Sequence, residues 1–371
     1  MNIYELVNNI STLANTMVNG HIKPFLIIGA PGCGKTTILE TDFAAAWSKL
    51  TGKPTDVIVE ILSNKEAPDV RGLPIPMRNT EWPTYRYAKP DLLDRIERSP
   101  CFHDGQVLVI LDEFTKCDSA MQKVTADLLQ NYRIGEYPLP SNVWLVATGN
   151  RQQDSSGETR QHAMLTNRMP RLNVELPIEH WARHARSISL PPISIAFAER
   201  FPTHFAEAVP PRDGAFCTYR SFTEFSKYLG TWNATHAKDL THVEDNTFTR
   251  SLAYGMIGEA ASLEFFAFAR VAEQLPTRQE VLSNPDTAVI PMAHAVDAQY
   301  AACNMAMSLA MEDVLHLAPA LKYIMRLPTI ELAVKAMVEL NKSHGGAITM
   351  NNPEAVRWLS QHKALVLDAN L

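Results

Sequence analysis

One short stretch near the N-terminus constrains this chain more than any other. Four apolar residues, Phe25 to Ile28, suit a buried strand, and they run directly into Gly-x-x-x-x-Gly-Lys-Thr, which ends at Thr36. A stretch compatible with a helix follows from Thr37 to Glu40. A strand, a glycine-rich loop of this spacing and a helix, in this order, form a phosphate-binding loop. The sequence therefore predicts a nucleotide-binding α/β domain.

The residue types in this loop suit the chemistry of phosphate binding. Its glycines let backbone N–H groups point at phosphate oxygens, and the N-terminus of the helix adds partial positive charge. Lys35 is expected to reach the β and γ phosphates, and the Thr36 hydroxyl to hold Mg²⁺. A plain strand–turn–helix corner could share the pattern, but a chance match in such a chain is about a one-in-a-hundred event. The expected nucleotide contacts are Gly29, Pro31, Gly32, Cys33, Gly34, Lys35, Thr36 and Thr37.

A second apolar strand ends in two adjacent carboxylates. Residues Gln106 to Leu111 suit a fully buried strand, and Asp112 and Glu113 follow directly. Ligands bind at the carboxyl ends of strands in a parallel sheet. Asp112 is therefore expected to bind the nucleotide's Mg²⁺ together with Thr36, and Glu113 to polarise the attacking water. The two side chains are expected to leave the strand in opposite directions, which suits two separate roles.

Two more polar residues follow expected sheet segments. Val143 to Thr148 suits a buried strand that delivers Asn150 to the same edge, where its amide could orient the lytic water, contact the γ-phosphate or cap the loop. Arg168 precedes a last strand, Leu172 to Leu176. It could be solvated, complement a helix dipole, or reach the γ-phosphate of a neighbouring subunit.

The remaining patterns predict a sheet domain followed by helices. An amphipathic helix is expected from Ile3 to Met17, and the helix after the loop is expected to run to about Ser48. Asp56 to Ile61 suits a second buried strand. A proline-rich insertion of loop or short-hairpin type is expected at 64–95, a helix at 119–130 and a hairpin at 131–140.

The strand pattern stops at about Ile178. Short helices are expected at 181–187, 193–204 and 221–229, separated by prolines and by Gly230. The last of these would begin near Arg220. Residues 250–371 are expected to be largely helical.

Composition and charge exclude several classes of protein. The chain has 371 residues, 46% of them hydrophobic and 20% charged, which is typical of a soluble globular protein with room for two domains. A net charge of −6 argues against a dedicated surface for duplex DNA, although a local basic pore remains compatible with it. Five scattered cysteines indicate reduced thiols in a cytoplasmic protein and no zinc site. No signal peptide or transmembrane helix is expected.

Together these residues resemble the AAA+ ATPases, and within them the MoxR-like group of bacteria and phages that has a long C-terminal helical extension. The similarity spans roughly residues 25 to 229. The residues that carry it are the Walker A segment Gly29 to Thr36, the Walker B segment Leu108 to Glu113, the sensor-1 strand end Ala147 to Asn150, Asn167-Arg168, and Arg220.

The resemblance implies a three-layer αβα sheet domain at 1–177, a helical lid at 178–245 and a helical extension at 246–371. It implies that Asn150 is sensor 1 and that Arg168 is an arginine finger, with Arg171 as a competing candidate. Arg220 would be sensor 2, with Arg212 as its competitor. The segments around 69–74 and 131–140 resemble inserts that face the pore or substrate side in relatives.

The implied activity is Mg²⁺-dependent ATP hydrolysis by a ring, expected to be a hexamer, that remodels a protein partner. MoxR-like proteins commonly work beside a protein with a von Willebrand A domain. A nucleic-acid motor is the alternative, because Arg71, Arg78, Arg86, Lys89, Trp82 and Tyr85 could form a charged stacking surface. A nucleotide-controlled assembly scaffold is a third hypothesis. The sequence leaves open the base preference and the identity of the partner.

Overall fold

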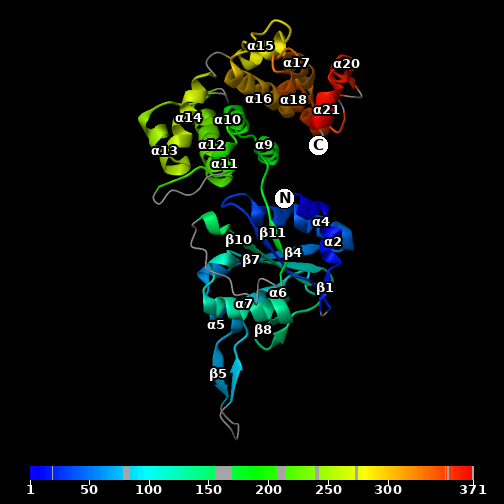
Figure 1. The fold of residues 1–371 in the computed structure, drawn as a ribbon, viewed down its shortest axis with the longest axis vertical. Helices are drawn as coiled ribbons and strands as arrows, with labels where there is room; N and C mark the ends of the chain where they lie inside the picture. The colour runs from blue at the N-terminus through cyan, green and yellow to red at the C-terminus, as the bar shows by residue number, and fades with distance from the viewer. Residues whose placement is uncertain are drawn as a thin grey trace. The chain divides into compact units, whose positions relative to one another are not determined.

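The protein is described by a computed structural model that covers residues 1–18, 20–77, 84–154, 169–206, 214–238, 242–271, 275–346, 348 and 351–369. The chain divides into two compact units, Met1–Leu176 and Pro177–Leu371 (Figure 1). In the described part of the chain, no helix has both the length and the apolar character needed to cross a membrane.

The first unit is built on a sheet of five parallel strands in the order β11-β3-β10-β7-β4. The strands are β3 (Phe25–Ile28), β4 (Thr55–Ile61), β7 (Gln106–Asp112), β10 (Val143–Gly149) and β11 (Arg171–Asn173). All residues of β10 are buried, as are the inner five of β7. The carboxyl ends of β3, β7 and β10 therefore meet at one edge of the sheet, as expected from the sequence.

Helices cover both faces of this sheet, which gives three αβα layers. One apolar cluster joins Ile27, Ile110 and Val146 to helices α1 (Glu5–Asn8) and α2 (Ile10–Ala14) and to the helical run after the loop. The opposite cluster joins alternate strand residues such as Val109 and Leu145 to α5 (Ala67–Arg71), α6 (Asp91–Arg98) and α7 (Ser119–Asn131). The predicted fold class is thus confirmed for this unit.

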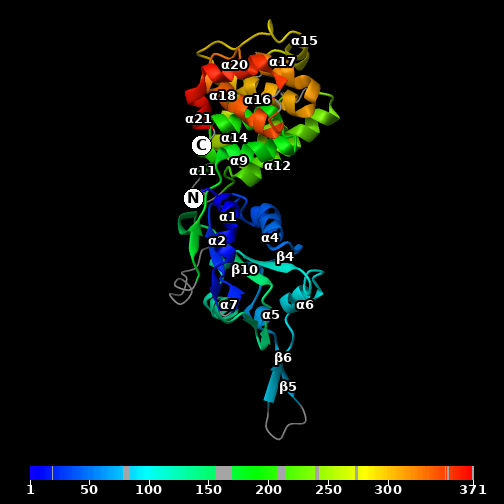
Figure 2. The same ribbon diagram turned by 90° about the vertical axis from the view of Figure 1, so that its right-hand side faces the viewer.

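Three short antiparallel pairs complete the first unit. They are β1–β2 (Met17–Val18 with His21–Ile22), β5–β6 (Pro74–Met77 with Thr84–Tyr87) and β8–β9 (Arg133–Ile134 with Tyr137–Pro138). The β5–β6 ribbon lies in the predicted insertion and projects away from the sheet, as Figure 2 shows. The β8–β9 pair is the predicted hairpin.

The structure corrects two expectations for the first unit. The N-terminal helix is split at Asn9, whose backbone angles, φ −104° and ψ 17°, depart from helical geometry. Its side-chain amide donates to the Glu5 carbonyl at 2.9 Å. Strand β4 lies at the edge of the sheet, with its last residue Ile61 exposed, and is not a fully buried strand. The apolar pattern identified the strand but could not give its place in the strand order.

The described elements of the second unit are helical. Its longer helices are α9 (Ile178–Ser187), α10 (Pro192–Arg200), α12 (Tyr219–Thr235), α13 (Thr247–Ile257), α14 (Glu259–Ala269), α16 (Val296–Glu312), α17 (Val314–Ile324), α18 (Ile330–Ser343) and α20 (Pro353–Gln361). Shorter helices are α11 (Thr203–Ala206), α15 (Arg278–Ser283) and α21 (Lys363–Ala369).

Helix α12 passes through Gly230, where the sequence predicts a break. The helix continues because its next turns are anchored: Asn233 is fully buried and donates to the His242 carbonyl at 2.8 Å. A side-chain carbon built at Gly230 would lie 3.5 Å from the ring of Pro191, at ordinary contact distance. Tertiary packing here outweighs the low helix propensity of one glycine.

A buried polar cluster connects four helices of the second unit. The Arg186 guanidinium of α9 donates to Glu199 on α10 at 3.0 Å, to Asn304 on α16 at 2.6 Å and to Glu339 on α18 at 2.6 Å. The Asn304 amide also donates to Glu199 at 2.8 Å. The Arg186 side chain is only 1% exposed, and its charge is paired inside the unit with two carboxylates.

Candidate nucleotide-binding site

The glycine-rich loop leaves the end of β3 and leads into a continuous helical run. That run consists of α3 (Lys35–Ile38), a π-helical stretch (Leu39–Phe43) and α4 (Ala44–Thr51). Gly34 precedes it with φ 79°, a left-handed conformation that residues with a side chain rarely adopt. The predicted strand–loop–helix arrangement is present, and the helix ends three residues beyond the expected Ser48.

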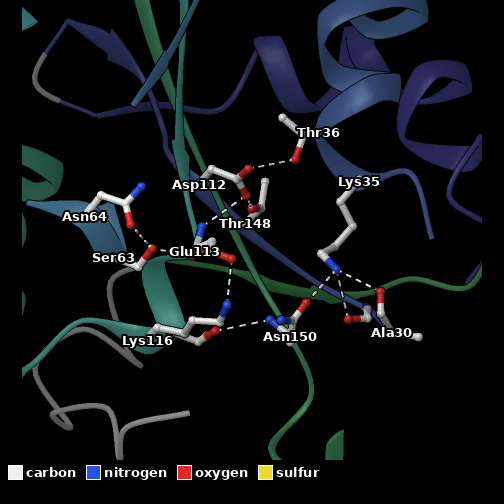
Figure 3. A network of polar contacts seen from close by, with 12 residues as sticks. Ala30, Lys35, Thr36, Ser63, Asn64, Asp112, Glu113, Lys116, Thr148 and Asn150 are labelled. Carbon is white, nitrogen blue, oxygen red and sulfur yellow. Dashed lines mark hydrogen bonds and ion pairs between the residues drawn. The ribbon is translucent and has the colours of Figure 1, made fainter. Parts of the chain in front are cut away.

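Lys35 is the central cation of the site. Its side chain is buried, with 8% of the residue exposed, and its Nζ donates to the carbonyls of Gly29 at 3.0 Å and Ala30 at 2.9 Å. It also donates to Oδ1 of Asn150 at 2.9 Å (Figure 3). These three acceptors are neutral oxygens, so an anionic phosphate oxygen would be a stronger partner for the same ammonium group.

Asp112, the last residue of β7, is held by hydroxyl groups on two sides. Its Oδ2 accepts from Oγ1 of Thr36 at 3.0 Å. Its Oδ1 accepts from the buried hydroxyl of Thr148 on β10 and from the backbone N–H of Glu113. Figure 3 shows Thr36 and Asp112 facing each other across the edge of the sheet. Two hard oxygen donors 3.0 Å apart suit Mg²⁺, which binds one or two protein oxygens alongside substrate phosphates.

Glu113 lies just beyond β7 in a left-handed conformation with φ 57°. Its Oε1 accepts from Nζ of Lys116 at 2.6 Å, and its Oε2 accepts from the hydroxyl of Ser63 (Figure 3). The different partners of Asp112 and Glu113 agree with two separate roles. They do not arise from strand alternation, because Glu113 has already left the strand.

Asn150 follows the end of β10. Its backbone N–H donates to Oγ1 of the buried Thr115 at 3.1 Å, and its side-chain oxygen contacts Lys35 as described above. The structure therefore brings together the glycine-rich loop, both carboxylates and Asn150 at one edge of the sheet.

Cys33 and Arg151 lie near the same loop. Burial raises the pKa of the Cys33 thiol, although the positive charges of Lys35 and Arg151 oppose the shift. Cys33 is therefore a protonated thiol at neutral pH, which argues against a reactive thiolate. The Arg151 guanidinium pairs with Asp154, with Nη2 to Oδ1 at 2.9 Å, and this carboxylate is 1% exposed.

Several predicted residues are not placed at this site. Arg168 and Arg212 lie outside the described residues, as do Arg78 and Trp82 of the insertion. Arg171 is exposed at the start of the edge strand β11. Arg220 is exposed in the first turn of α12, in the second unit.

Sequence reasoning missed four residues of the site: Ser63, Thr115, Lys116 and Thr148. Thr148 could have been noticed as a polar residue at the end of an otherwise apolar strand. The other three lie on short 3₁₀ segments, Leu62–Asn64 and Phe114–Lys116, whose side-chain directions the sequence pattern does not give.

Comparisons with known proteins assign no family. A scan against models of protein families and a search of curated proteins found no match. Among solved structures, the chain is similar to a mutant of RuvB from Thermotoga maritima, with 13% identity and a TM-score of 0.39. The similarity covers 75% of this chain and 73% of that one. A likeness at this level is too weak to identify a family or an activity.

Proposed function

We propose that this chain is a Mg²⁺-dependent ATPase of the AAA+ type. The observation that supports this most is the convergence of Lys35, Thr36, Asp112, Glu113 and Asn150 at the carboxyl edge of a parallel sheet. These residues come from the glycine-rich loop after β3 and from the ends of β7 and β10. Phosphoryl-transfer sites need this set: a phosphate cradle with a cation, metal ligands, a carboxylate near the nucleophile and a polar sensor.

The roles follow from the contacts. Lys35 would exchange its neutral acceptors for β- and γ-phosphate oxygens, while Thr36 and Asp112 would hold Mg²⁺. The metal ion, when bound, supplies charge stabilisation for the transferring phosphoryl group. Thr148 would keep Asp112 in a fixed orientation.

Glu113 would act as the base that polarises water. In this structure both of its carboxylate oxygens are engaged, one by Lys116 and one by Ser63. A carboxylate can accept a proton from water only through a free lone pair aimed at it. Each carboxylate oxygen has two lone pairs, so these contacts leave acceptor positions for water while they fix the orientation of the carboxylate. Asn150 would orient the water or contact the γ-phosphate.

We further propose that subunits assemble head to tail into a hexameric ring. An arginine supplied by a neighbour requires a heterologous contact, and such contacts close into rings or continue as filaments. Arg168 is the proposed finger, with Arg171 as the alternative, and Arg220 or Arg212 would sense nucleotide from the lid. Residues 178–245 would form this lid and 246–371 an extension. The expected role is remodelling of a protein partner in the cytoplasm, possible partners including a von Willebrand A domain protein.

A substitution at Glu113 tests the motor hypothesis. We expect Glu113→Gln to bind ATP but to lose turnover by on the order of 10²–10⁴-fold, because the amide is a poor base. The variant with ATP should remain assembled in sedimentation experiments and should capture the partner on affinity resin. Normal partner remodelling by this variant would contradict the motor hypothesis and favour the assembly scaffold.

A further inference from the structure

A cavity of about 480 Å³ lies in the first unit, away from the nucleotide site. Its walls come from α5, β6, α7 and the β8–β9 turn. The turn packs directly on α5, since a side-chain carbon built at Gly135 would lie 2.6 Å from the Arg71 carbonyl oxygen. Gly135 also has φ 58°. The two predicted inserts are thus joined at their bases, and the cavity lies where they meet.

The cavity wall carries three cations: Arg71, Lys123 and Arg133. Within the described part of the chain, none of the three has a carboxylate oxygen at ion-pair distance. The Arg71 guanidinium lies over the Tyr87 ring, 4.6 Å from its centroid, and Arg133 donates to the Glu136 carbonyl at 2.7 Å. Three neighbouring cations without carboxylate partners favour an anionic ligand.

The rest of the lining limits the kind of anion. Val70, Leu128 and Ile134 are buried apolar side chains on the wall. Asp127 and Glu136 also line the cavity, so positive charges exceed negative ones by only one. A nucleic-acid backbone carries a negative charge on every phosphate, so Asp127 and Glu136 would repel it. A single carboxylate beside an apolar group fits the lining better.

The surface next to the cavity favours an extended polypeptide over a small molecule. Tyr87 meets Tyr85 edge-to-face at 5.4 Å, and from there the ribbon exposes Tyr85 by 57%, Leu73 by 61% and Ile75 by 52%. Tyr85 shares one face of the ribbon with Tyr87, whereas Ile75 pairs with Arg86 on the other face, so Tyr85 is the exposed side chain that continues from the cavity.

The two edges of the ribbon differ. The Ala88 N–H donates to the Leu73 carbonyl, so Leu73 and Ala88 form a hydrogen-bonded pair. Because hydrogen-bonded and non-hydrogen-bonded pairs alternate along antiparallel strands, the backbone groups of Pro74 and Pro76 point away from β6. Prolines have no N–H and block strand addition at that edge. The outer edge of β6, which carries the backbone groups of Tyr85 and Tyr87, remains suited to pairing with an added strand.

We propose that this cavity and β6 together bind an acidic, extended segment of a partner protein. One carboxylate of the segment lies among Arg71, Lys123 and Arg133, and a neighbouring apolar side chain contacts Val124, the partly buried apolar residue of the lining. The segment's backbone pairs with the free edge of β6. If the proposed function holds, this segment belongs to the remodelled partner.

The test measures binding directly and without nucleotide, so its outcome does not depend on ATP hydrolysis. The probe is a fluorescein-labelled peptide with one glutamate flanked by leucine and neutral polar residues, and its binding to the full chain is measured by fluorescence anisotropy. Lys123→Glu is the test variant. Lys49→Glu is its matched control, because Lys49 is an exposed lysine of α4 outside the cavity with the same change in charge.

We expect Lys123→Glu to weaken binding by about 3- to 10-fold, because the attraction between Lys123 and the peptide carboxylate becomes a repulsion between two carboxylates. Lys49→Glu should bind as the wild type does. Adding Arg71→Glu should weaken binding further, and the double variant should prefer the same peptide with lysine in place of the glutamate. Equal affinities for the two single variants would overturn the proposal. So would tighter binding of single-stranded oligothymidylate with the same dependence on Lys123, which would assign the cavity to nucleic acid.

Discussion

Thr36 and Thr148 fix the two oxygens of Asp112 from opposite sides. Thr36 is the second residue of α3, whereas Thr148 lies on β10, the strand beside β7. Lys35 and Asn150 likewise meet across 115 positions of sequence. At the scale of single residues, the site consists of contacts between residues that follow different strands. Asp112 and Lys35 are each oriented by a side chain that another strand end supplies.

Thr148→Val tests whether orientation of Asp112 matters. The substitution preserves shape but removes the hydroxyl that donates to Oδ1. Residues that orient a metal ligand typically change metal affinity by about 10- to 100-fold when substituted. We therefore expect a rise of that size in the Mg²⁺ concentration that gives half-maximal ATP turnover.

Thr125→Val provides the matched control, because Thr125 is equally buried but donates only within α7. Its Mg²⁺ dependence should match that of the wild type. An unchanged Mg²⁺ requirement in Thr148→Val would show that Thr148 does not position the metal ligand.

Two short 3₁₀ segments control Glu113 at the scale of elements. Phe114–Lys116 supplies the Lys116 ammonium, and Leu62–Asn64 supplies the Ser63 hydroxyl from the end of β4. The second segment leads directly into the insertion that carries the β5–β6 ribbon.

Removing the Lys116 contact should raise the basal rate. The Lys116–Glu113 pair is partly exposed, and such pairs contribute about 0.2–1 kcal/mol. Lys116→Met is therefore expected to raise kcat by up to about fivefold with KM for ATP unchanged, while Lys116→Arg should retain the wild-type rate. A lower kcat in Lys116→Met would indicate that the ion pair assists hydrolysis.

The sequence was most informative where one element carries the whole pattern. Phe25 to Ile28 followed by the glycine-rich loop predicted a strand, loop and helix that the structure contains. The apolar strands ending at Asp112 and before Asn150 were predicted almost to the residue. Predictions failed where the outcome depends on packing between distant segments. Gly230 stays helical because the buried Asn233 anchors the following turn of α12. The position of β4 at the sheet edge depends on which strand pairs with β7, and the apolar pattern of β4 alone does not give this.

At the scale of the whole molecule, each of the two units has its own core. In the second unit, Arg186 and its partners connect α9 and α10, within the proposed lid, to α16 and α18, within the proposed extension. A buried charged cluster of this kind is costly to disrupt, because removing one member leaves an uncompensated charge. We therefore infer that the proposed lid and extension move together.

Arg186→Met should reveal this connection as a loss of stability. We expect the free energy of unfolding of the second unit to fall by about 3–5 kcal/mol, measured by urea titration of tryptophan fluorescence and circular dichroism. Arg200→Met is the control, since Arg200 pairs with Asp297 at the surface and should cost about 0–1 kcal/mol. Equal losses in the two variants would contradict a structural role for the buried cluster.

The most direct test of the proposed activity is steady-state phosphate release from ATP by the full chain, with Mg²⁺ and with EDTA. The wild type should release phosphate only with Mg²⁺, because in the proposed site Thr36 and Asp112 would hold the metal that accompanies the nucleotide. Lys35→Ala should show no turnover and no ATP binding, and Glu113→Gln should bind ATP without releasing phosphate. Turnover by Lys35→Ala equal to that of the wild type, or turnover of the wild type in EDTA, would contradict the assignment of this site.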